Sequence, residues 1–214
     1  MKTPLPLLPA LTLALALLTT QAQETPHYVN GGEGLRAATL PKQGLYYRNY
    51  LIHYRAATYR DGGGDELNVN LDLESWAWVH RLLWVTDVDV AGADLSFGLV
   101  VPVVATEFEL ENLGVYDREE GVADISVSPL TLSWHGDGYD LVAAYDVFLP
   151  VADYNADEPA SLGKEYWTHM LTLGGTYYLD AARRWHASIL GGYEIHSERW
   201  NTDIQAGDDF HVEW

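Results

Sequence analysis

Polar and apolar side chains alternate along most of the chain beyond residue 44. Between residues 185 and 195 the odd positions are apolar or small, whereas His186, Ser188 and Glu194 hold even positions. Because successive side chains of a strand point to opposite faces, this segment predicts a strand with one apolar face and one wet face. Comparable stripes predict strands at 45–54, 67–84, 95–103, 125–134, 139–149 and 167–179, and a short eighth strand beginning at Phe210.

The phase of two stripes shifts along the strand. After Glu74, and again after Ser128, the bulky residues move from odd to even positions. A slip of one residue turns the apolar face over unless an extra residue is absorbed as a β-bulge. We therefore predict bulges near Ser75 and Pro129.

Hydrophilic links of two lengths separate the predicted strands. The long ones lie at 55–66, 107–121, 152–164 and 199–209, and the short ones at 86–92, 136–138 and 180–184. Outer-membrane barrels alternate short periplasmic turns with longer external loops in this way. Aromatic side chains near the strand ends suit the girdles of such a barrel, although a β-sandwich also alternates. We predict an all-β fold: an antiparallel transmembrane β-barrel over residues 45–214.

The eighth predicted strand is short. Residues 210–214 fall below the roughly 9–11 residues that a tilted strand needs to cross a bilayer. An open sheet edge in lipid leaves backbone groups unpaired, at a high cost in free energy. We therefore expect the barrel in this sequence to be incomplete at its carboxyl end. The alternative is that Phe210, Val212 and Trp214 form a barrel terminus of the kind that the barrel-assembly machinery recognises.

The first residues predict a secretory signal peptide. A positive start at Lys2 precedes an apolar run over residues 5–18 and a small residue, Ala22, suited to cleavage. A transmembrane anchor is the alternative, but the run is shorter than the ~20 apolar residues that a spanning helix needs. We expect residues 1–22 to be removed and the mature chain to reach the outer membrane of a Gram-negative bacterium. Residues 23–44 lack alternation and predict either a periplasmic tail or a plug-like segment.

Charge and composition exclude several classes of protein. The 214 residues include 31 acidic and 12 basic side chains, for a formal net charge of −19, and no cysteine. A nucleic-acid partner is excluded because phosphate binding needs a cationic face. Without cysteine, the chain has no disulfide, thiolate metal site or thiol nucleophile. Outer-membrane lipids are the expected partners of the apolar faces.

Several sequence blocks resemble a known family. They are residues 34–41 (GLRAATLP), 44–50 (GLYYRNY), 124–130 (DISVSPL), 134–136 (WHG), 163–167 (GKEYW) and 173–178 (LGGTYY). In this order they resemble the meta-pathway phenol-degradation family of outer-membrane transporters. The resemblance implies a β-barrel linked to uptake of aromatic or other hydrophobic compounds. It also implies a chain that continues past the block around residues 207–211.

Together these features predict a channel or transporter, not an enzyme, for passive uptake of small hydrophobic compounds, aromatic ones among them. The polar positions of the clearest alternations are expected to line its lumen or mouth, although solvated lumen filler is the plainer interpretation for any one of them. They are Asn68, Asn70, Asp72, Glu74, His186, Ser188, Glu194 and His196. No catalytic residue, metal ligand or cofactor is assigned.

Two other functions stay open. An outer-membrane lipid hydrolase would use Ser188 as nucleophile, His186 as base, and Glu194 or Glu198 to orient that base. A soluble periplasmic β-barrel would carry an apolar ligand and would show the same alternation.

Acidic links offer oxygen atoms to a calcium ion. The stretch 61–65 and the group Asp203, Asp208 and Asp209 are the candidates. Neither has the ligand spacing of a known calcium loop, so hydrated acidic loops are the expectation.

Overall fold

Antiparallel strands make up nearly all of the regular structure. The computed structural model describes residues 26–202 and 205–214, so the predicted signal peptide, residues 1–22, lies outside the described residues. No helix within those two ranges is long and apolar enough to cross a membrane. The strands are β1 (Gly44–Ala56), β2 (Tyr59–Arg60), β3 (Glu66–Leu67), β4 (Leu71–Val90), β5 (Ala93–Leu110), β6 (Val115–Val122), β7 (Ile125–His135), β8 (Tyr139–Leu149), β9 (Thr168–Tyr178), β10 (His186–His196) and β11 (Asp209–Glu213). A 3₁₀ turn, η1 (Glu111–Leu113), joins β5 to β6.

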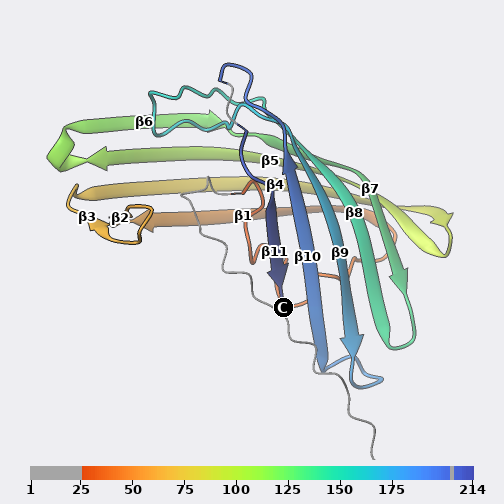
Figure 1. Ribbon diagram of the computed structural model, residues 1–214. Coiled ribbons are helices and arrows are strands. Elements are labelled where there is room, and N and C mark those ends of the chain that lie inside the picture. The colour runs from red at the N-terminus through yellow and green to blue at the C-terminus, as the bar shows by residue number, and fades with distance from the viewer. Residues whose placement is uncertain (1–25, 203–204) are drawn as a thin grey trace, which may run out of the picture.

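The main sheet curls into a half-barrel (Figure 1). Its order is β1-β4-β5-β7-β8-β9-β10-β11, and β6 pairs with the later half of β5. The seven full-length predicted strands correspond to β1, β4, β5, β7, β8, β9 and β10, and the short eighth to β11. The predicted all-β, antiparallel, barrel-type fold is therefore confirmed. Among the described strands, β1 and β11 do not pair with each other and β6 pairs with β5 alone, so β1, β6 and β11 each have an unpaired edge.

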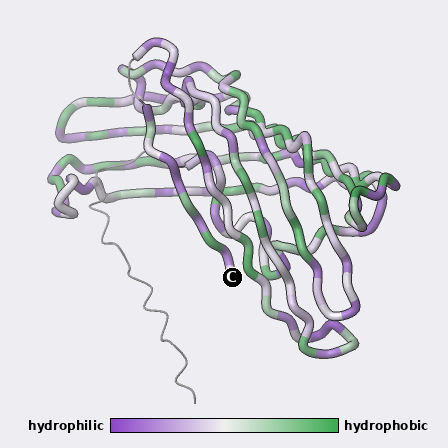
Figure 2. The backbone as a smooth tube through the Cα atoms, turned by 45° about the vertical axis from the view of Figure 1, so that its right-hand side comes forward, coloured by the Kyte–Doolittle hydropathy of each residue, from purple (hydrophilic) through white to green (hydrophobic). Residues whose placement is uncertain are grey.

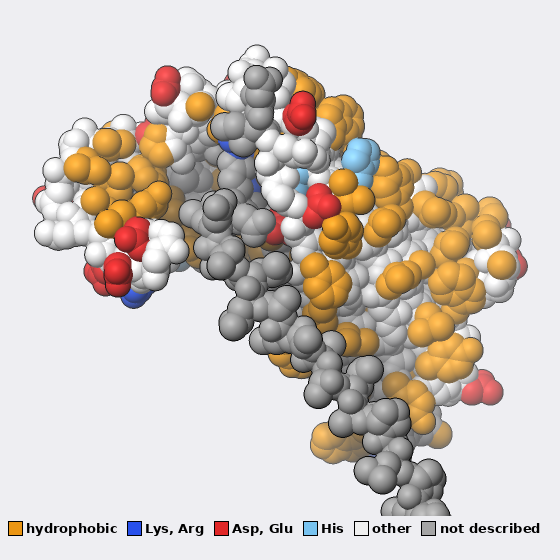
Figure 3. All heavy atoms as spheres, in the orientation of Figure 1, with side chains coloured by type: hydrophobic (Ala, Val, Ile, Leu, Met, Phe, Trp, Pro, Cys, Tyr) orange, Lys and Arg blue, Asp and Glu red, His pale blue; other side chains and the backbone are white. Residues whose placement is uncertain are grey.

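The two faces of the sheet differ in polarity. On β10 the side chains of Ile189 and Tyr193 are exposed, whereas those of Glu194 and His196 are buried. We call the face that carries Glu194 the inner face and the face that carries Ile189 the outer face. Apolar residues recur along each strand and spread over the surface of β8 to β10 (Figures 2 and 3). Exposed members of this surface are Leu141, Leu171, Leu173 and Tyr177. An apolar surface of this extent suits contact with lipid.

Strand β7 contains the bulge predicted near Pro129. Val127 pairs with Val147 and Leu130 pairs with Tyr145, so β7 carries one extra residue between these two pairs. The extra residue keeps Leu130 on the same face as Val127. Proline has no N–H to donate to a ladder, and a bulge is where a sheet tolerates it. This prediction is confirmed.

The bulge predicted near Ser75 is wrong. The pairing of β4 with both β1 and β5 continues without a shift through residues 73–85. Asp72 and Glu74 therefore share the outer face with Trp76, whose indole N–H donates to Glu74 at 3.0 Å. With 20 residues, β4 is longer than the roughly 9–11 that cross a bilayer. Polar side chains at its start can thus face outward into water while the register stays unchanged.

The predicted long link at 107–121 is mostly strand. β5 continues to Leu110 and pairs with β6 through residues 103–110, and η1 forms the turn between them. The acidic composition of this stretch is typical of a loop, but it also suits a hairpin that extends into water. The long connection is therefore an extended β-hairpin (Figure 1).

A cluster of buried apolar side chains lies between the inner face and residues 26–43, which we call the N-terminal segment. Ala38, Val142 and Leu190 pack together and are at most 5% exposed. Gly174 permits this approach, because a Cβ at that position would lie 2.9 Å from the Cβ of Ala38 and 2.6 Å from Cδ1 of Leu190. The N-terminal segment thus packs closely against the sheet at Gly174, which has no side chain.

A charge on the outer face tests its contact with lipid. Leu173 is 69% exposed in the middle of β9. We expect Leu173→Arg to lower the free energy of unfolding in a bilayer by about 2–4 kcal/mol, because the guanidinium would lie in hydrocarbon. Urea titration of the full chain in lipid vesicles measures this change. Leu173→Ala is the matched control and should cost much less. Equal small losses for both variants would contradict a lipid-facing surface.

Candidate functional site: the inner face and the N-terminal segment

Polar contacts hold the N-terminal segment to the inner face along most of its length. The backbone N–H of His27 donates to Glu194 on β10, and Glu33 forms an ion pair with Arg81 on β4. Further contacts join Tyr28 and Gly31 to Glu213, Ala38 to Ser188, and Thr39 to Thr176 and Tyr178. The segment therefore lies over the sheet and does not extend away from it.

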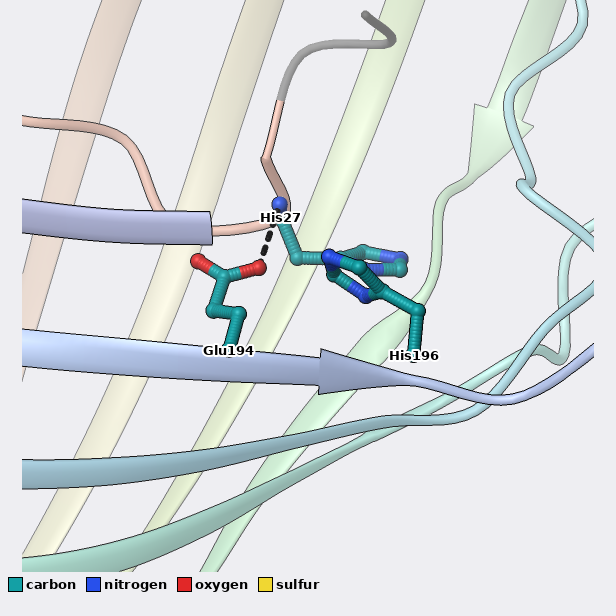
Figure 4. Close-up of side chains that lie close together, drawn as sticks. All are labelled: His27, Glu194 and His196. Carbon is teal, nitrogen blue, oxygen red and sulfur yellow. Dashed lines mark hydrogen bonds between the residues drawn. The ribbon is translucent and has the colours of Figure 1, made fainter. Parts of the chain in front are cut away.

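Glu194 anchors the start of the segment. Its side chain is 0% exposed, and its two oxygens accept the backbone N–H groups of His27 and Tyr28, each at 3.0 Å. Figure 4 shows the bond from His27. A buried carboxylate needs such donors, because an unpaired charge away from water is costly. The two bonds thus couple the wall of the sheet to the path of the segment.

Two histidine rings meet at Thr168. The Oγ1 atom of Thr168 lies 2.8 Å from Nδ1 of His27 and 2.7 Å from Nδ1 of His196. On the other side of each ring, Nε2 of His27 faces Asp124 at 3.2 Å, and Nε2 of His196 faces Asp209 at 3.1 Å. The cluster combines groups from the N-terminal segment, the β6–β7 link, β9, β10 and β11.

Burial governs the protonation of the groups around this cluster. Desolvation lowers the pKa of His27, against the opposing hydrogen bond with Asp124. Desolvation also lowers the pKa of Lys164, although neighbouring carboxylates, Glu194 first among them, act in the opposite direction. The pKa of Tyr166 is raised by burial and then by the same carboxylates. These shifts favour a neutral His27 ring and a protonated Tyr166 hydroxyl at neutral pH.

The eight predicted lumen residues do not lie together on one face of the sheet. Those on β10 have inner-face positions, and two of them, Glu194 and His196, lie together with His27. The other two, His186 and Ser188, lie nearer the opposite end of β10. That these four residues line a lumen stays a prediction.

The four predicted residues within and before β4 lie elsewhere. Asp72 and Glu74 occupy the outer face and pair with basic side chains of β1, so they point away from the inner face. The predicted bulge at Ser75 would have placed Asp72 and Glu74 on the inner face, and its absence places them on the outer face. Asn68 and Asn70 lie in the exposed link before β4 and form hydrogen bonds with the η1 turn.

Several charged or titratable groups at the inner face were missed at the sequence level, among them His27, Arg81 and Asp140. His27 lies in a segment without alternation, so no signal marks it. Arg81 and Asp140 do carry a signal, because each has the opposite parity to the exposed apolar residues of its strand, although apolar residues such as Val79 and Val142 share the inner face with them. Asp140 is 0% exposed and accepts a hydrogen bond from the hydroxyl of Tyr178 at 2.6 Å.

The contacts of Ser188 do not favour a hydrolase. Its Oγ lies 2.9 Å from Oγ1 of Thr176, whereas Nδ1 of His186 is buried without a hydrogen-bond partner. Glu194, the acid expected to orient the base, accepts backbone N–H groups instead. Activation of a serine requires a hydrogen bond to its base, and within the described ranges this chain forms none between Ser188 and His186.

The acidic stretch 61–65 forms a turn around the side chain of Asp61. Oδ1 of Asp61 accepts the N–H groups of Gly63 at 2.9 Å and of Asp65 at 3.0 Å. This is the local bonding by which an aspartate stabilises a turn. Of the other calcium candidates, Asp203 lies outside the described residues.

Removal of the Glu194 carboxylate tests the attachment of the N-terminal segment. Hydrogen bonds to a charged acceptor contribute about 1.5–3 kcal/mol each, and 1.4 kcal/mol corresponds to a factor of about ten. We expect Glu194→Ala to accelerate trypsin cleavage after the exposed Arg36 at least tenfold in the refolded chain. Glu198→Ala, at an exposed position just beyond β10, is the matched control and should leave the rate unchanged. The anchoring role fails if both variants are cleaved as slowly as the parent chain.

Comparisons with known proteins agree with this architecture. A solved structure similar to this chain is an outer membrane channel from Pseudomonas putida F1, with a TM-score of 0.64 and 20% sequence identity. The likeness covers 76% of this chain and 59% of the channel, so the chain spans less than two thirds of the channel's length. At this identity the likeness shows the fold, and no curated protein matches the chain. A family model described as "Putative MetA-pathway of phenol degradation" matches residues 56–214. The predicted resemblance is thereby confirmed over these residues, whereas the blocks at 34–41 and 44–50 lie outside the match, and the chain belongs to this phenol-degradation family.

Proposed function

We propose that the chain forms part of the wall of an outer-membrane channel for passive uptake of small hydrophobic compounds, aromatic ones among them. The observation that carries this proposal is the exposure of the outer face, where Leu173 is 69% and Ile189 57% exposed, opposite an inner face of buried polar side chains. A soluble carrier would turn its apolar face toward the ligand and its polar face toward water. The observed polarity is the reverse, which favours a membrane barrel.

The solute class is inferred from chemistry and family together. The family description names phenol degradation. Phenols combine an apolar ring with one polar group, which a wall of mixed polar and aromatic side chains accommodates. The likeness to an outer membrane channel supports passage without a covalent step.

Within this proposal the N-terminal segment acts as a plug. It lies against the inner face, on the side where a solute would pass, and is held there mainly by polar contacts. Residues 1–22 would be removed on export as a signal peptide. Outer-membrane lipids and the barrel-assembly machinery would then be the partners of the mature chain.

Uptake of labelled solutes tests the solute class. Cells that export the chain to the outer membrane should take up labelled p-cresol at least several-fold faster than cells with an empty vector. Uptake of a labelled sugar such as arabinose should not change. Glu194→Ala should raise the p-cresol rate further if the N-terminal segment obstructs passage. Equal acceleration of both solutes would contradict hydrophobic selectivity, and no acceleration of either would contradict transport.

Ion selectivity tests the effect of the acidic links. With 31 acidic and 12 basic residues, the chain should attract cations to the mouth of the channel and repel anions. In planar bilayers under a KCl gradient we expect a reversal potential of the sign that indicates potassium preference. The preference should shrink at high ionic strength because salt screens exposed charges. A chloride preference would contradict the prediction.

A further inference from the structure

The cluster of His27, Glu194 and His196 has the donor set of a transition-metal site. One ring nitrogen of each histidine and one carboxylate oxygen of Glu194 all lie within 4.8 Å of one another. Glu194 and His196 are fully or almost fully buried on β10, and His27 approaches from the N-terminal segment (Figure 4). Two imidazoles and one carboxylate are a combination that binds zinc and related divalent ions.

The hydrogen bonds around the two rings leave one nitrogen without a donor. When each Nε2 carries the proton that it donates to Asp124 or Asp209, each Nδ1 has only a lone pair to offer. Both Nδ1 atoms face the hydroxyl of Thr168, which has a single proton. The hydroxyl can therefore satisfy one ring and not the other. A cation bound by both lone pairs would remove this mismatch.

The outer partners of the rings match those of metal-binding histidines. A histidine that binds a metal through one nitrogen usually donates its other N–H to a carboxylate, which orients the ring and raises its basicity. Here Asp124 stands behind His27 at 3.2 Å, and Asp209 stands behind His196 at 3.1 Å. Both rings thus have the orientation and the electrostatic support that a metal ligand needs.

We propose that His27, Glu194 and His196 bind a divalent ion of the Zn²⁺ type, which fastens the N-terminal segment to β10. Zinc–nitrogen bonds of about 2.0–2.1 Å place tetrahedral ligand atoms roughly 3.3 Å apart, so the three groups must draw closer and the Thr168 side chain must rotate. His27 lies in an irregular segment, which can make this adjustment without breaking a strand pair. Nitrogen donors favour zinc over calcium or magnesium, which prefer oxygen ligands.

Such a site would join distant parts of the chain. His27 and Glu194 are 167 residues apart in sequence. A metal bond between them would hold the N-terminal segment more firmly than hydrogen bonds alone. The inference concerns metal chemistry on the purified chain and does not require the proposed transport.

Metal titration of the full chain without a histidine tag tests the proposal. The chain is refolded in detergent, treated with EDTA and titrated with Zn²⁺, with Co²⁺ as a visible-absorption probe of nitrogen and oxygen coordination. We expect one equivalent of Zn²⁺ to bind and to slow trypsin cleavage after Arg36 at least tenfold. His27→Ala and His196→Ala should abolish stoichiometric binding. His186→Ala, which removes another inner-face histidine of β10, should keep it.

Heat-modifiable migration on a gel serves as the folding control for each variant. If His196→Ala does not fold, His27→Ala decides the outcome, because His27 lies outside the sheet. Absence of stoichiometric Zn²⁺ binding by the parent chain would overturn the proposal. Equal binding by the parent chain and His27→Ala would overturn it as well, and would leave the cluster as a network of hydrogen bonds.

Discussion

Every long strand of this sheet must do two things at once: pair its backbone groups with a neighbour and sort its side chains between two unlike faces. Residues 185–195 meet both demands, with Ile189 and Tyr193 outward and Glu194 inward, while the pairing to β9 runs unbroken along β10. Backbone groups in hydrocarbon have no water to bond with, so strand pairing is what allows such a chain to enter a membrane. The bulge at Pro129 has the same origin, because it restores the outward face of β7 where the sequence slips by one residue.

Because polar side chains are placed on the inner face, the buried charges there need hydrogen-bond or ion-pair partners. Glu194, Arg81 and Asp140 are charged side chains that need partners from outside their own strands; neighbouring strands supply Tyr178 and His135 to Asp140. For Glu194 and Arg81 the partners come from the N-terminal segment. The segment is therefore attached mainly by polar groups, together with a small apolar cluster around Ala38 and the stacking of His27 on Phe148 and of Tyr28 on His211. Attachment of this kind can be released at a cost of several hydrogen bonds and does not require the sheet to unfold.

The unpaired edges of β1 and β11 constrain how the proposed channel can be built. Unpaired backbone groups along an edge are costly in hydrocarbon, so each edge needs a partner strand or an aqueous setting. The similar channel from Pseudomonas putida F1 is longer, and this chain spans 59% of it. A half-barrel wall with a polar inner face, an apolar outer face and a segment laid across it is consistent with a passage that the N-terminal segment narrows.

Alternation by itself determined the seven long strands, the short last strand and the outer surface, because the two-residue period of a strand is local and repeats along each of them. It did not reveal β6 or the full lengths of β4 and β5, whose acidic stretches are typical of loops. The Pro129 bulge could be predicted for the same reason, since a β-bulge absorbs the one-residue shift in the pattern and also tolerates the proline. At Ser75 the same logic failed, because β4 is longer than a bilayer crossing requires and its pattern inverts near its start without any slip. Only the tertiary structure brought His27 to Glu194 and His196, and Glu33 to Arg81. These contacts join residues far apart in the chain, and the segment that supplies His27 and Glu33 has no periodicity from which its position could be read.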